Sequence, residues 1–433
     1  MKTIIGKLLV TLILCANIGV AKASTDGSGP FVGVRDGKFY LEGKQYNYVG
    51  TNFWYGAILA SDGEGGNQKR LRKELDLLQK NGIENLRILV GGDGPNGIQS
   101  HIEPTLQKEA GVYNDTILVG LDRLIAELEK RGMKAVLYMN NAWEWSGGYS
   151  TYLQWAGEGK APVPSVDGWP AYMAFVKKFV NNEKAKELSY NNVKYIVSRV
   201  NTVTGRPYTE SPAIMSWQIA NEPRAFSDEN KKPFAEWIKA TARIIRSIDK
   251  NHMISTGSEG MHGCEEDIEL WNEIHCFPEI DYANVHIWPY NWSWISKETI
   301  TENVDSACIN TKQYIADHYA YMNRAKKPIV LEEFGYPRDN FKFTPGSPTS
   351  GRDAYFKYVF SIIKNSGMIA GCNFWGWGGL ADPKHTFWKK GDPYTGDPAQ
   401  EEQGLNSVFA KDKSTLRIIR ESVKSIVKDN KKK

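Results

Sequence analysis

The sequence has little excess charge of either sign. Its 433 residues carry 54 lysines and arginines against 50 aspartates and glutamates. Such an even balance gives no basic surface of the kind that nucleic-acid binding requires, so we expect no nucleic-acid partner. Hydrophobic residues make up 41% and charged residues 24%, as is typical of globular domains. The length is sufficient for a large buried core.

Long apolar runs are absent beyond the N-terminus, so we expect no membrane span. The one apolar stretch, residues 8–20, follows Lys2 and Lys7 and leads to Ala21-Lys22-Ala23. This order is typical of a secretory signal peptide. We predict cleavage after Ala23, so that residues 1–23 are the signal and the mature protein is secreted or periplasmic. Cys15 follows Leu14, where a lipobox has a small residue, so we expect no lipid anchor.

Cysteines are few, and four of the five remain after this cleavage. An oxidising compartment favours a disulfide. The candidates are Cys264, Cys276 and Cys308, with the pairing of Cys264 left open between the other two. Cys372 lies in an apolar, strand-like run, which favours a free thiol in the core. One group of histidines and cysteines offers potential metal ligands: His262, Cys264, His275 and Cys276. Their spacing fits no standard zinc motif, so we expect no metal.

Strand and helix patterns alternate along the chain. Apolar runs typical of buried strands begin near Tyr46, Glu84, Lys134, Ala213, His252, Tyr282, Pro328 and Met368. Apolar stripes at helical spacing occupy residues 71–78, 121–128, 193–200 and 233–248. Eight strands alternating with helices predict an α/β fold, the (β/α)8 or TIM barrel. A doubly wound sheet is the alternative, but no glycine-rich phosphate turn follows the first strand.

Two segments depart from this simple repeat. Residues 31–44 alternate around Asp36-Gly37, a hairpin signal, and we place this N-terminal hairpin across the N-terminal face of the barrel. Residues 140–212, between the third and fourth strands, are too long for a plain loop and helix and begin with many aromatic residues. We expect this enlarged region to build one wall of a cleft. No repeat or linker is visible, so we expect residues 24–433 to form a single domain and the protein to be a monomer.

Two glutamates end apolar strands in separate parts of the chain. Glu222 lies in Trp-Gln-Ile-Ala-Asn-Glu-Pro-Arg at residues 217–224, and Glu333 lies in Leu-Glu-Glu-Phe-Gly at residues 331–335. Active sites of barrels lie at the carboxyl ends of the strands. Two carboxylates about 5 Å apart are the arrangement for retaining glycoside hydrolysis. In that reaction one attacks the anomeric carbon and the other, protonated, donates to the leaving oxygen.

The two motifs resemble the signatures of glycoside hydrolase family 5, within the large clan of retaining (β/α)8 hydrolases. Other segments are similar to the β-mannanase branch of that family: residues 50–54, 85–87, 140–143, 199–205, 257–260, 286–289 and 374–377. The resemblance covers nearly all of residues 46–380.

This resemblance implies roles for individual residues. Glu222 is the implied acid/base and Glu333 the implied nucleophile. Asn221 is implied to hydrogen-bond the 2-hydroxyl of the sugar, and Arg87 to lie beside Glu333 and keep it ionised. Glu332 is expected to point to the opposite side of the strand, in a structural ion pair.

Further residues complete the implied site. Arg224 and Glu259 are implied to contact a sugar on the leaving side, with a supporting carboxylate as the alternative for Glu259. His286 ends the sixth strand and is assigned to the site. Trp288 stands where much of the family has a tyrosine that hydrogen-bonds the nucleophile. An indole N–H can donate but cannot accept or titrate, and we keep Trp288 as a site residue.

Tryptophans are numerous, with 14 in the chain. Trp375 matches the residue that forms the floor under the sugar at the cleavage point, and Trp143 matches a cleft residue. Aromatic faces stack on the apolar faces of pyranose rings. For four other tryptophans the sequence does not distinguish a position in the cleft from one in the core: Trp145, Trp155, Trp292 and Trp377.

The resemblance implies a secreted endo-β-1,4-mannanase that acts on mannan, glucomannan and galactomannan by double displacement, without a cofactor. Arg224 and the segment His-Ile-Trp-Pro favour this activity over that of an endo-β-1,4-glucanase on the same scaffold. A non-catalytic glycan-binding barrel is the alternative from another class. The presence of both Glu222 and Glu333 argues against it.

Overall fold

The structure, a computed structural model, describes residues 25–430. Residues 1–24 and 431–433 lie outside this range, so the expected signal peptide, its cleavage after Ala23 and Cys15 stay predictions. Within residues 25–430 there is no helix with the length and apolar character needed to cross a bilayer.

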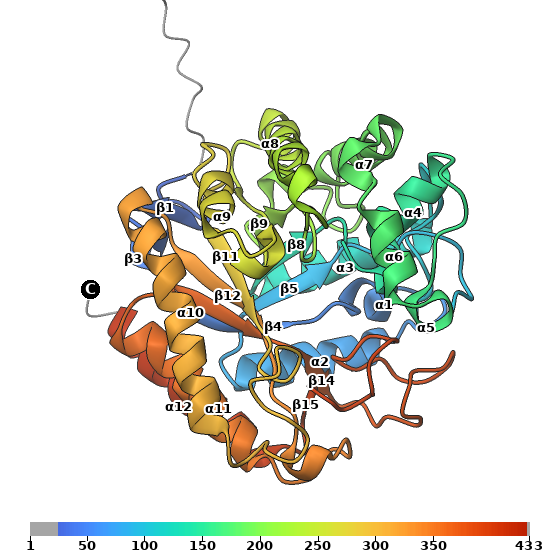
Figure 1. The fold of residues 1–433 in the computed structure, drawn as a ribbon. Helices are drawn as coiled ribbons and strands as arrows, with labels where there is room; N and C mark the ends of the chain where they lie inside the picture. The colour runs from blue at the N-terminus through green and yellow to red at the C-terminus, as the bar shows by residue number, and fades with distance from the viewer. Residues whose placement is uncertain (1–24, 431–433) are drawn as a thin grey trace, which may run out of the picture.

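Eight parallel strands form the central sheet (Figure 1). Along the chain they are β4 (Tyr48–Asn52), β5 (Asn85–Leu89), β8 (Lys134–Tyr138), β9 (Ile214–Gln218), β10 (Met253–Ser255), β11 (Ala283–Ile287), β12 (Ile329–Phe334) and β13 (Gly371–Phe374). Each strand pairs with the next one in this order, except β10 with β11, and β13 pairs with β4. Between β10 and β11, the backbone N–H of Asp281 donates to the Ile254 carbonyl at 2.9 Å. The predicted (β/α)8 barrel is confirmed, and the doubly wound sheet is wrong.

Helices surround the barrel (Figure 1). The principal ones are α2 (Gln68–Lys80), α3 (Asp115–Arg131), α7 (Glu183–Val197), α8 (Lys231–Ile248), α9 (Ile268–His275), α10 (Val304–Ala325), α11 (Ser350–Asn365) and α12 (Lys413–Asn430). The four apolar stripes in the sequence correspond to α2, α3, α7 and α8. In α8, for example, Trp237, Ile238 and Ile245 are buried. Burial of such a stripe against the strands is the main stabilisation of an amphipathic helix.

The predicted N-terminal hairpin is present. Strands β1 (Gly33–Arg35) and β2 (Lys38–Leu41) pair in antiparallel fashion, and β3 (Lys44–Gln45) extends the small sheet. Val32 and Phe39 pack into a buried cluster with side chains from the amino ends of the barrel strands, among them Val136 and Val330. The hairpin therefore covers the N-terminal face of the barrel, and the opposite face is left for the site.

Two insertions rise around that opposite face. The first, between β8 and β9, contains α4 (Gly148–Trp155), α5 (Pro164–Asp167), α6 (Trp169–Val176) and α7. The second is a largely irregular segment, residues 380–407, between β14 (Trp377–Gly379) and β15 (Val408–Phe409). Side chains from both insertions line the same cavity.

The predicted disulfide is wrong. Cys264, Cys276, Cys308 and Cys372 are all free. Cys276 is exposed at the end of α9, whereas Cys264 and Cys308 are buried in other elements. Cys372 is buried in β13, as its apolar surroundings predict.

Candidate active site

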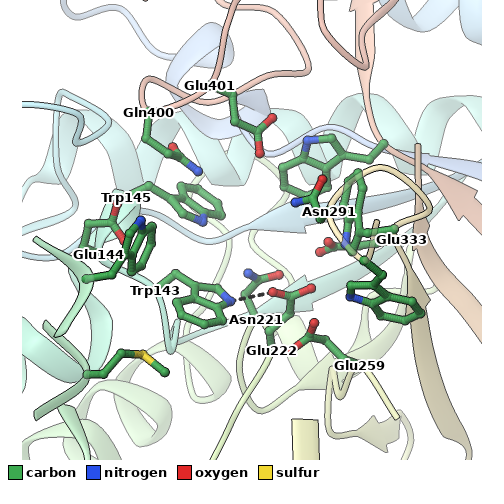
Figure 2. A pocket seen from close by; sticks show the side chains of 15 residues that line it. Trp143, Glu144, Trp145, Asn221, Glu222, Glu259, Asn291, Glu333, Gln400 and Glu401 are labelled. Atoms are coloured by element: carbon green, nitrogen blue, oxygen red, sulfur yellow. Dashed lines mark hydrogen bonds between the residues drawn. The ribbon is translucent and has the colours of Figure 1, made fainter. Parts of the chain in front are cut away.

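A cavity of about 500 Å³ lies at the carboxyl ends of the barrel strands (Figure 2). Its lining is aromatic and acidic, and contains Trp143, Glu144, Trp145, Trp169, Met173, Asn221, Glu222, Glu259, Trp288, Asn291, Trp292, Glu333, Trp375, Gln400 and Glu401. Apolar walls with a few convergent polar groups are typical of ligand sites.

Glu222 lies just beyond β9, on a bent backbone. Its φ is 46°, in the left-handed region, which costs a non-glycine residue about 1–3 kcal/mol. Its backbone N–H donates to the Gly257 carbonyl at 3.0 Å, which ties the turn to the segment after β10. This conformation is therefore held by neighbouring backbone, and it presents the carboxylate to the cavity.

Glu333 reaches the cavity through a register shift in β12. Val285 pairs with Leu331 and His286 pairs with Glu333, so Glu332 is an extra residue on its strand. Alternation along the strand predicts that Glu332 faces away from Glu333, and this prediction is wrong. Both glutamates approach Arg87, and Glu332 Oε2 lies 3.8 Å from Arg87 Nε. The extra residue disrupts the two-residue alternation.

The two predicted catalytic glutamates lie close together. One carboxylate oxygen of Glu222, one of Glu333 and a ring nitrogen of His286 are all within 4.8 Å of one another. In residues 25–430 this is the one group of three potential metal ligands that meets such a spacing. The guanidinium of Arg87 beside Glu333 disfavours a divalent cation there.

Arg87 holds the site together from the middle of the barrel. It is completely buried and forms an ion pair with Glu333. Its Nη1 also donates to Asn52 Oδ1 at 3.0 Å, its Nη2 to Asn221 Oδ1 at 2.9 Å and its Nε to Gln218 Oε1 at 2.7 Å. One planar guanidinium thus orients both Asn221 and Glu333.

Burial raises the pKa of both Glu222 and Glu333, because it disfavours a charged carboxylate. The positive charge of Arg87 opposes this rise in the pKa of Glu333. At Glu222 the opposing influences are the charge of Arg224 and hydrogen bonds from the indoles of Trp143 and Trp288. Two neighbouring carboxyls of this kind titrate as a coupled pair.

Trp143, Arg224 and Glu259 form a connected group beside Glu222. Trp143 Nε1 donates to Glu222 Oε2 at 2.5 Å. The Arg224 guanidinium lies over the Trp143 ring, 5.2 Å from its centroid, and its Nε donates to Glu259 Oε2 at 2.7 Å. Arg224 and Glu259 therefore support each other. Glu259 lines the cavity beside Glu222 (Figure 2), whereas Arg224 is not among the lining residues and contacts Glu259 and Trp143.

His286 lies between the two glutamates. Its Nδ1 is 2.8 Å from Glu222 Oε1 and 3.4 Å from Glu333 Oε2. Burial and the charge of Arg87 lower the pKa of the imidazole well below its usual value, so the ring is neutral. A neutral ring with one N–H can donate from Nδ1 to a carboxylate and fix its orientation.

Trp375 forms part of the cavity between two other indoles. Its ring centroid lies 6.2 Å from that of Trp145 and 6.1 Å from that of Trp288, both in edge-to-face arrangements. Of the open tryptophans, Trp145 and Trp292 line the cavity. Trp377 instead is buried and donates to Glu74 Oε2 at 2.9 Å, a core position.

The cavity also contains residues that no sequence motif indicates. Glu144, Trp169 and Met173 come from the insertion after β8, and Gln400 and Glu401 come from the segment after β14. The aromatic content of the first insertion is a signal that its side chains form a wall. Gln400 and Glu401 have no comparable signal.

The sequence matches the family described as GH family 5 beta-mannosidase-like over residues 29–431. Among curated relatives, the putative mannan endo-1,4-beta-mannosidase 4 of Arabidopsis thaliana is 30% identical over 388 residues, which cover 85% of this chain and 87% of that protein. The mannan endo-1,4-beta-mannosidase 3 of the same plant is also 30% identical, over 87% and 88% of the two chains.

Solved structures share the fold. A glycoside hydrolase family 5 mannosidase from Rhizomucor miehei has a TM-score of 0.84 at 29% identity, over 93% of this chain and 99% of that one. The endo-beta-1,4-mannanase from Thermotoga petrophila has a TM-score of 0.66 at 23% identity, over 89% and 78%. With the barrel, the cavity and the match over residues 29–431, this chain belongs to glycoside hydrolase family 5, in its β-mannosidase-like group, and is a glycoside hydrolase.

Proposed function

We propose that this enzyme hydrolyses β-1,4-mannosidic bonds by double displacement with retention of configuration. The observation that carries the proposal is the separation of the carboxylates, since oxygens of Glu222 and Glu333 lie within 4.8 Å of each other. Retaining glycosidases have their two carboxyl groups about 5–5.5 Å apart, and inverting ones about 6.5–9.5 Å, to leave room for a water molecule.

In the first step, Glu333 attacks the anomeric carbon and Glu222 donates its proton to the glycosidic oxygen. The leaving chain departs, and a covalent glycosyl ester of Glu333 is formed. In the second step, Glu222 takes a proton from water, and the resulting hydroxyl attacks the same carbon and releases Glu333. This mechanism requires Glu333 ionised and Glu222 protonated. Burial raises the pKa of both carboxyls, and the ion pair with Arg87 favours the ionised form of Glu333.

Arg87→Gln is expected to move the acid limb of the kcat/KM profile to higher pH, by about one unit or more. Glu333 must be ionised to attack, and the positive charge of Arg87 lowers its pKa. Loss of that charge raises the pKa of Glu333, so a higher pH is needed to ionise it. The measurement is the pH dependence of hydrolysis of an aryl β-mannoside. Arg87→Lys, which keeps a charge, should shift the limb less, and an unmoved limb in Arg87→Gln would contradict the assignment.

Mannan is the proposed substrate class. The plant relatives carry mannan in their names. The proposal assigns the ion pair of Arg224 and Glu259 to the leaving side, where it would favour mannan over glucan. Mannose and glucose differ in the orientation of the 2-hydroxyl, which Asn221 is placed to contact. We expect release of reducing sugar from locust bean gum to exceed that from carboxymethylcellulose by at least about tenfold. Faster cleavage of the cellulose derivative would make the enzyme a glucanase.

Two modes of attack remain as candidates. The plant relatives are named endo-acting, which supports cleavage inside the chain. A specific observation supports a second mode, action at chain ends. The Rhizomucor miehei structure at 29% identity is a mannosidase, and a variant of that protein is in complex with mannosyl-fructose, a short ligand. The likeness to endo-mannanase structures is lower, with TM-scores of 0.64–0.67 at 22–23% identity.

We also propose that the protein is exported and that residues 24–433 form one catalytic domain. The basic and apolar composition of residues 1–23 supports export. Sequencing the N-terminus of the protein from the medium or periplasm tests this, and the expected first residue is Ser24.

A further inference from the structure

Trp169 differs from the other tryptophans in its exposure. The chain has 14 tryptophans, all within residues 25–430, and Trp169, at 51%, is the one that is largely exposed. A single exposed apolar side chain is common on protein surfaces, but Trp169 also lines the cavity. An indole that is partly in water and partly in a ligand cavity offers a flat apolar surface that a bound sugar would cover.

The backbone holds Trp169 at the start of α6. Gly168, directly before it, has a φ of 85°, in the left-handed region that favours glycine. Pro170, directly after it, lies in the first turn of the helix, where the fixed φ of proline suits the helical conformation. The chain is therefore restricted on both sides of the indole.

Two aromatic contacts hold the ring itself. Its centroid lies 5.8 Å from that of Trp143 and 5.9 Å from that of Tyr172, with the ring planes close to perpendicular in both pairs. Tyr172 is buried, and its hydroxyl donates to the Ala142 carbonyl at 2.6 Å. The indole of Trp169 is thus oriented before any ligand arrives, which lowers the cost of binding.

Trp169 lies on the leaving side of the bond that is cleaved. The acid donates its proton to the leaving oxygen, so the leaving sugar begins beside Glu222. Trp143 donates to Glu222, and Trp169 packs against Trp143. In Figure 2, Trp143 and Glu144 lie on one side of Glu222, whereas Glu333 lies on the other.

Glu144 supplies an unused acceptor near this ring. The residue is 2% exposed and lines the cavity, and its Oε2 is buried without a hydrogen-bond partner. Burial and then the charge of Glu144 raise the pKa of Tyr172, so this carboxyl lies near the tyrosine that contacts Trp169. A buried acceptor without a donor is costly, and a sugar hydroxyl is a suitable donor.

We propose that Trp169 and Glu144 form a binding position for a sugar of the leaving chain. The pyranose ring would lie on the indole face, and one of its hydroxyls would donate to the Glu144 carboxylate. The inference rests on the proposed mannan hydrolysis and adds a specificity-determining pair to it. Neither residue takes part in the chemical steps, so their contribution is to favour substrates whose leaving group is itself a sugar.

The test compares two substrates in Trp169→Leu, which keeps an apolar side chain beside Trp143 but has no flat face. For mannotetraose, kcat/KM should fall at least tenfold. For 2,4-dinitrophenyl β-mannoside, kcat should change less than twofold, because breakdown of the covalent intermediate by water limits that rate and no leaving sugar is then bound. Trp169→Phe keeps an aromatic face and should lose at most threefold on mannotetraose.

Glu144→Ala should show the same selectivity, with a fall of at least fivefold in kcat/KM for mannotetraose and little change in kcat for the aryl mannoside. Glu144→Gln keeps an acceptor and should lose less. Val166→Ala is the matched control, since Val166 is an apolar side chain of the same insertion, is 65% exposed and does not line the cavity. It should keep the wild-type rates on both substrates.

An unchanged kcat/KM for mannotetraose in Trp169→Leu would overturn the inference. So would an equal fall with both substrates, because the indole would then act only through Trp143 and Glu222. Absence of any hydrolysis of mannotetraose, locust bean gum or the aryl mannoside by the wild-type enzyme would instead overturn the proposed function.

Oxidation of indoles by N-bromosuccinimide provides a measurement that does not depend on the folding of Trp169→Leu. In Glu333→Ala, which should bind mannohexaose without cleaving it, the sugar should slow oxidation of Trp169 at least fivefold. Trp388 is partly buried and does not line the cavity, so its oxidation should change less than twofold. Equal oxidation of Trp169 with and without saturating mannohexaose counts against the inference.

Discussion

Glu333→Ala is expected to lower kcat on mannan by about 10⁴-fold or more, since it removes the group that forms the covalent intermediate. The carboxylate of Glu333 is held by Arg87 within 4.8 Å of the Glu222 carboxylate, and among residues 25–430 no other carboxyl lies so close to both Glu222 and His286. Steady-state rates on locust bean gum measure the loss. The melting temperature is also expected to fall, because Ala leaves the buried guanidinium of Arg87 without this ion-pair partner.

Added azide distinguishes the roles of the two glutamates. In Glu333→Ala, azide can enter the space of the lost carboxylate and attack 2,4-dinitrophenyl β-mannoside once, with inversion, to give the α-mannosyl azide. Recovery of the β-azide from this variant would mean that the two glutamates have the reverse roles. The control is the wild-type enzyme with azide, which should give mannose only.

Glu222→Ala is expected to lower kcat on mannan by about 10²–10⁴-fold, because an unactivated leaving sugar needs a proton. A dinitrophenyl group leaves without one, so the intermediate on Glu333 should still form from the aryl mannoside and then accumulate. Azide should speed its breakdown and give the β-azide, since the second attack inverts the configuration again.

The pH profile gives a second measure of Glu222. Burial raises the pKa of Glu222, so the proton is retained toward neutral pH, and activity falls when pH exceeds that pKa. Removing the residue should abolish this basic limb for aryl mannosides with good leaving groups. If the basic limb persists in Glu222→Ala, another group causes it. The hydrogen bonds from Trp143 and Trp288 to Glu222 would then have a different role.

The barrel and the centre of the site can be predicted from the sequence because both depend on strands. Short apolar runs indicate the eight strands, and the carboxyl ends of parallel strands converge on one face. Residues that directly follow strands, such as Glu222, therefore meet in space even when the chain between them is long. The hairpin is similarly visible, because the Asp-Gly turn and the alternation are local signals.

The remaining features depend on contacts that are not local. Helix α10 has no clear apolar stripe, because its buried face includes Thr311 and His318. Gln400 and Glu401 lie in an irregular segment whose path depends on Asp397 and on Arg352, about fifty residues earlier in the chain. No pattern within residues 394–407 indicates which side chains face the cavity.

The register shift in β12 makes the position of the nucleophile depend on the number of residues and not only on their identity. By the alternation of the strand, the side chain of Glu333 would follow that of Leu331 toward the helices, and the extra residue Glu332 turns it inward. During evolution, side chains around this strand can change while the active carboxylate keeps its direction. Loss of a single residue from the strand cannot be tolerated in the same way. Most surface loops tolerate insertions and deletions. In β12 the same change would turn the Glu333 side chain away from the cavity, so we expect insertions and deletions to be rare in this part of the gene.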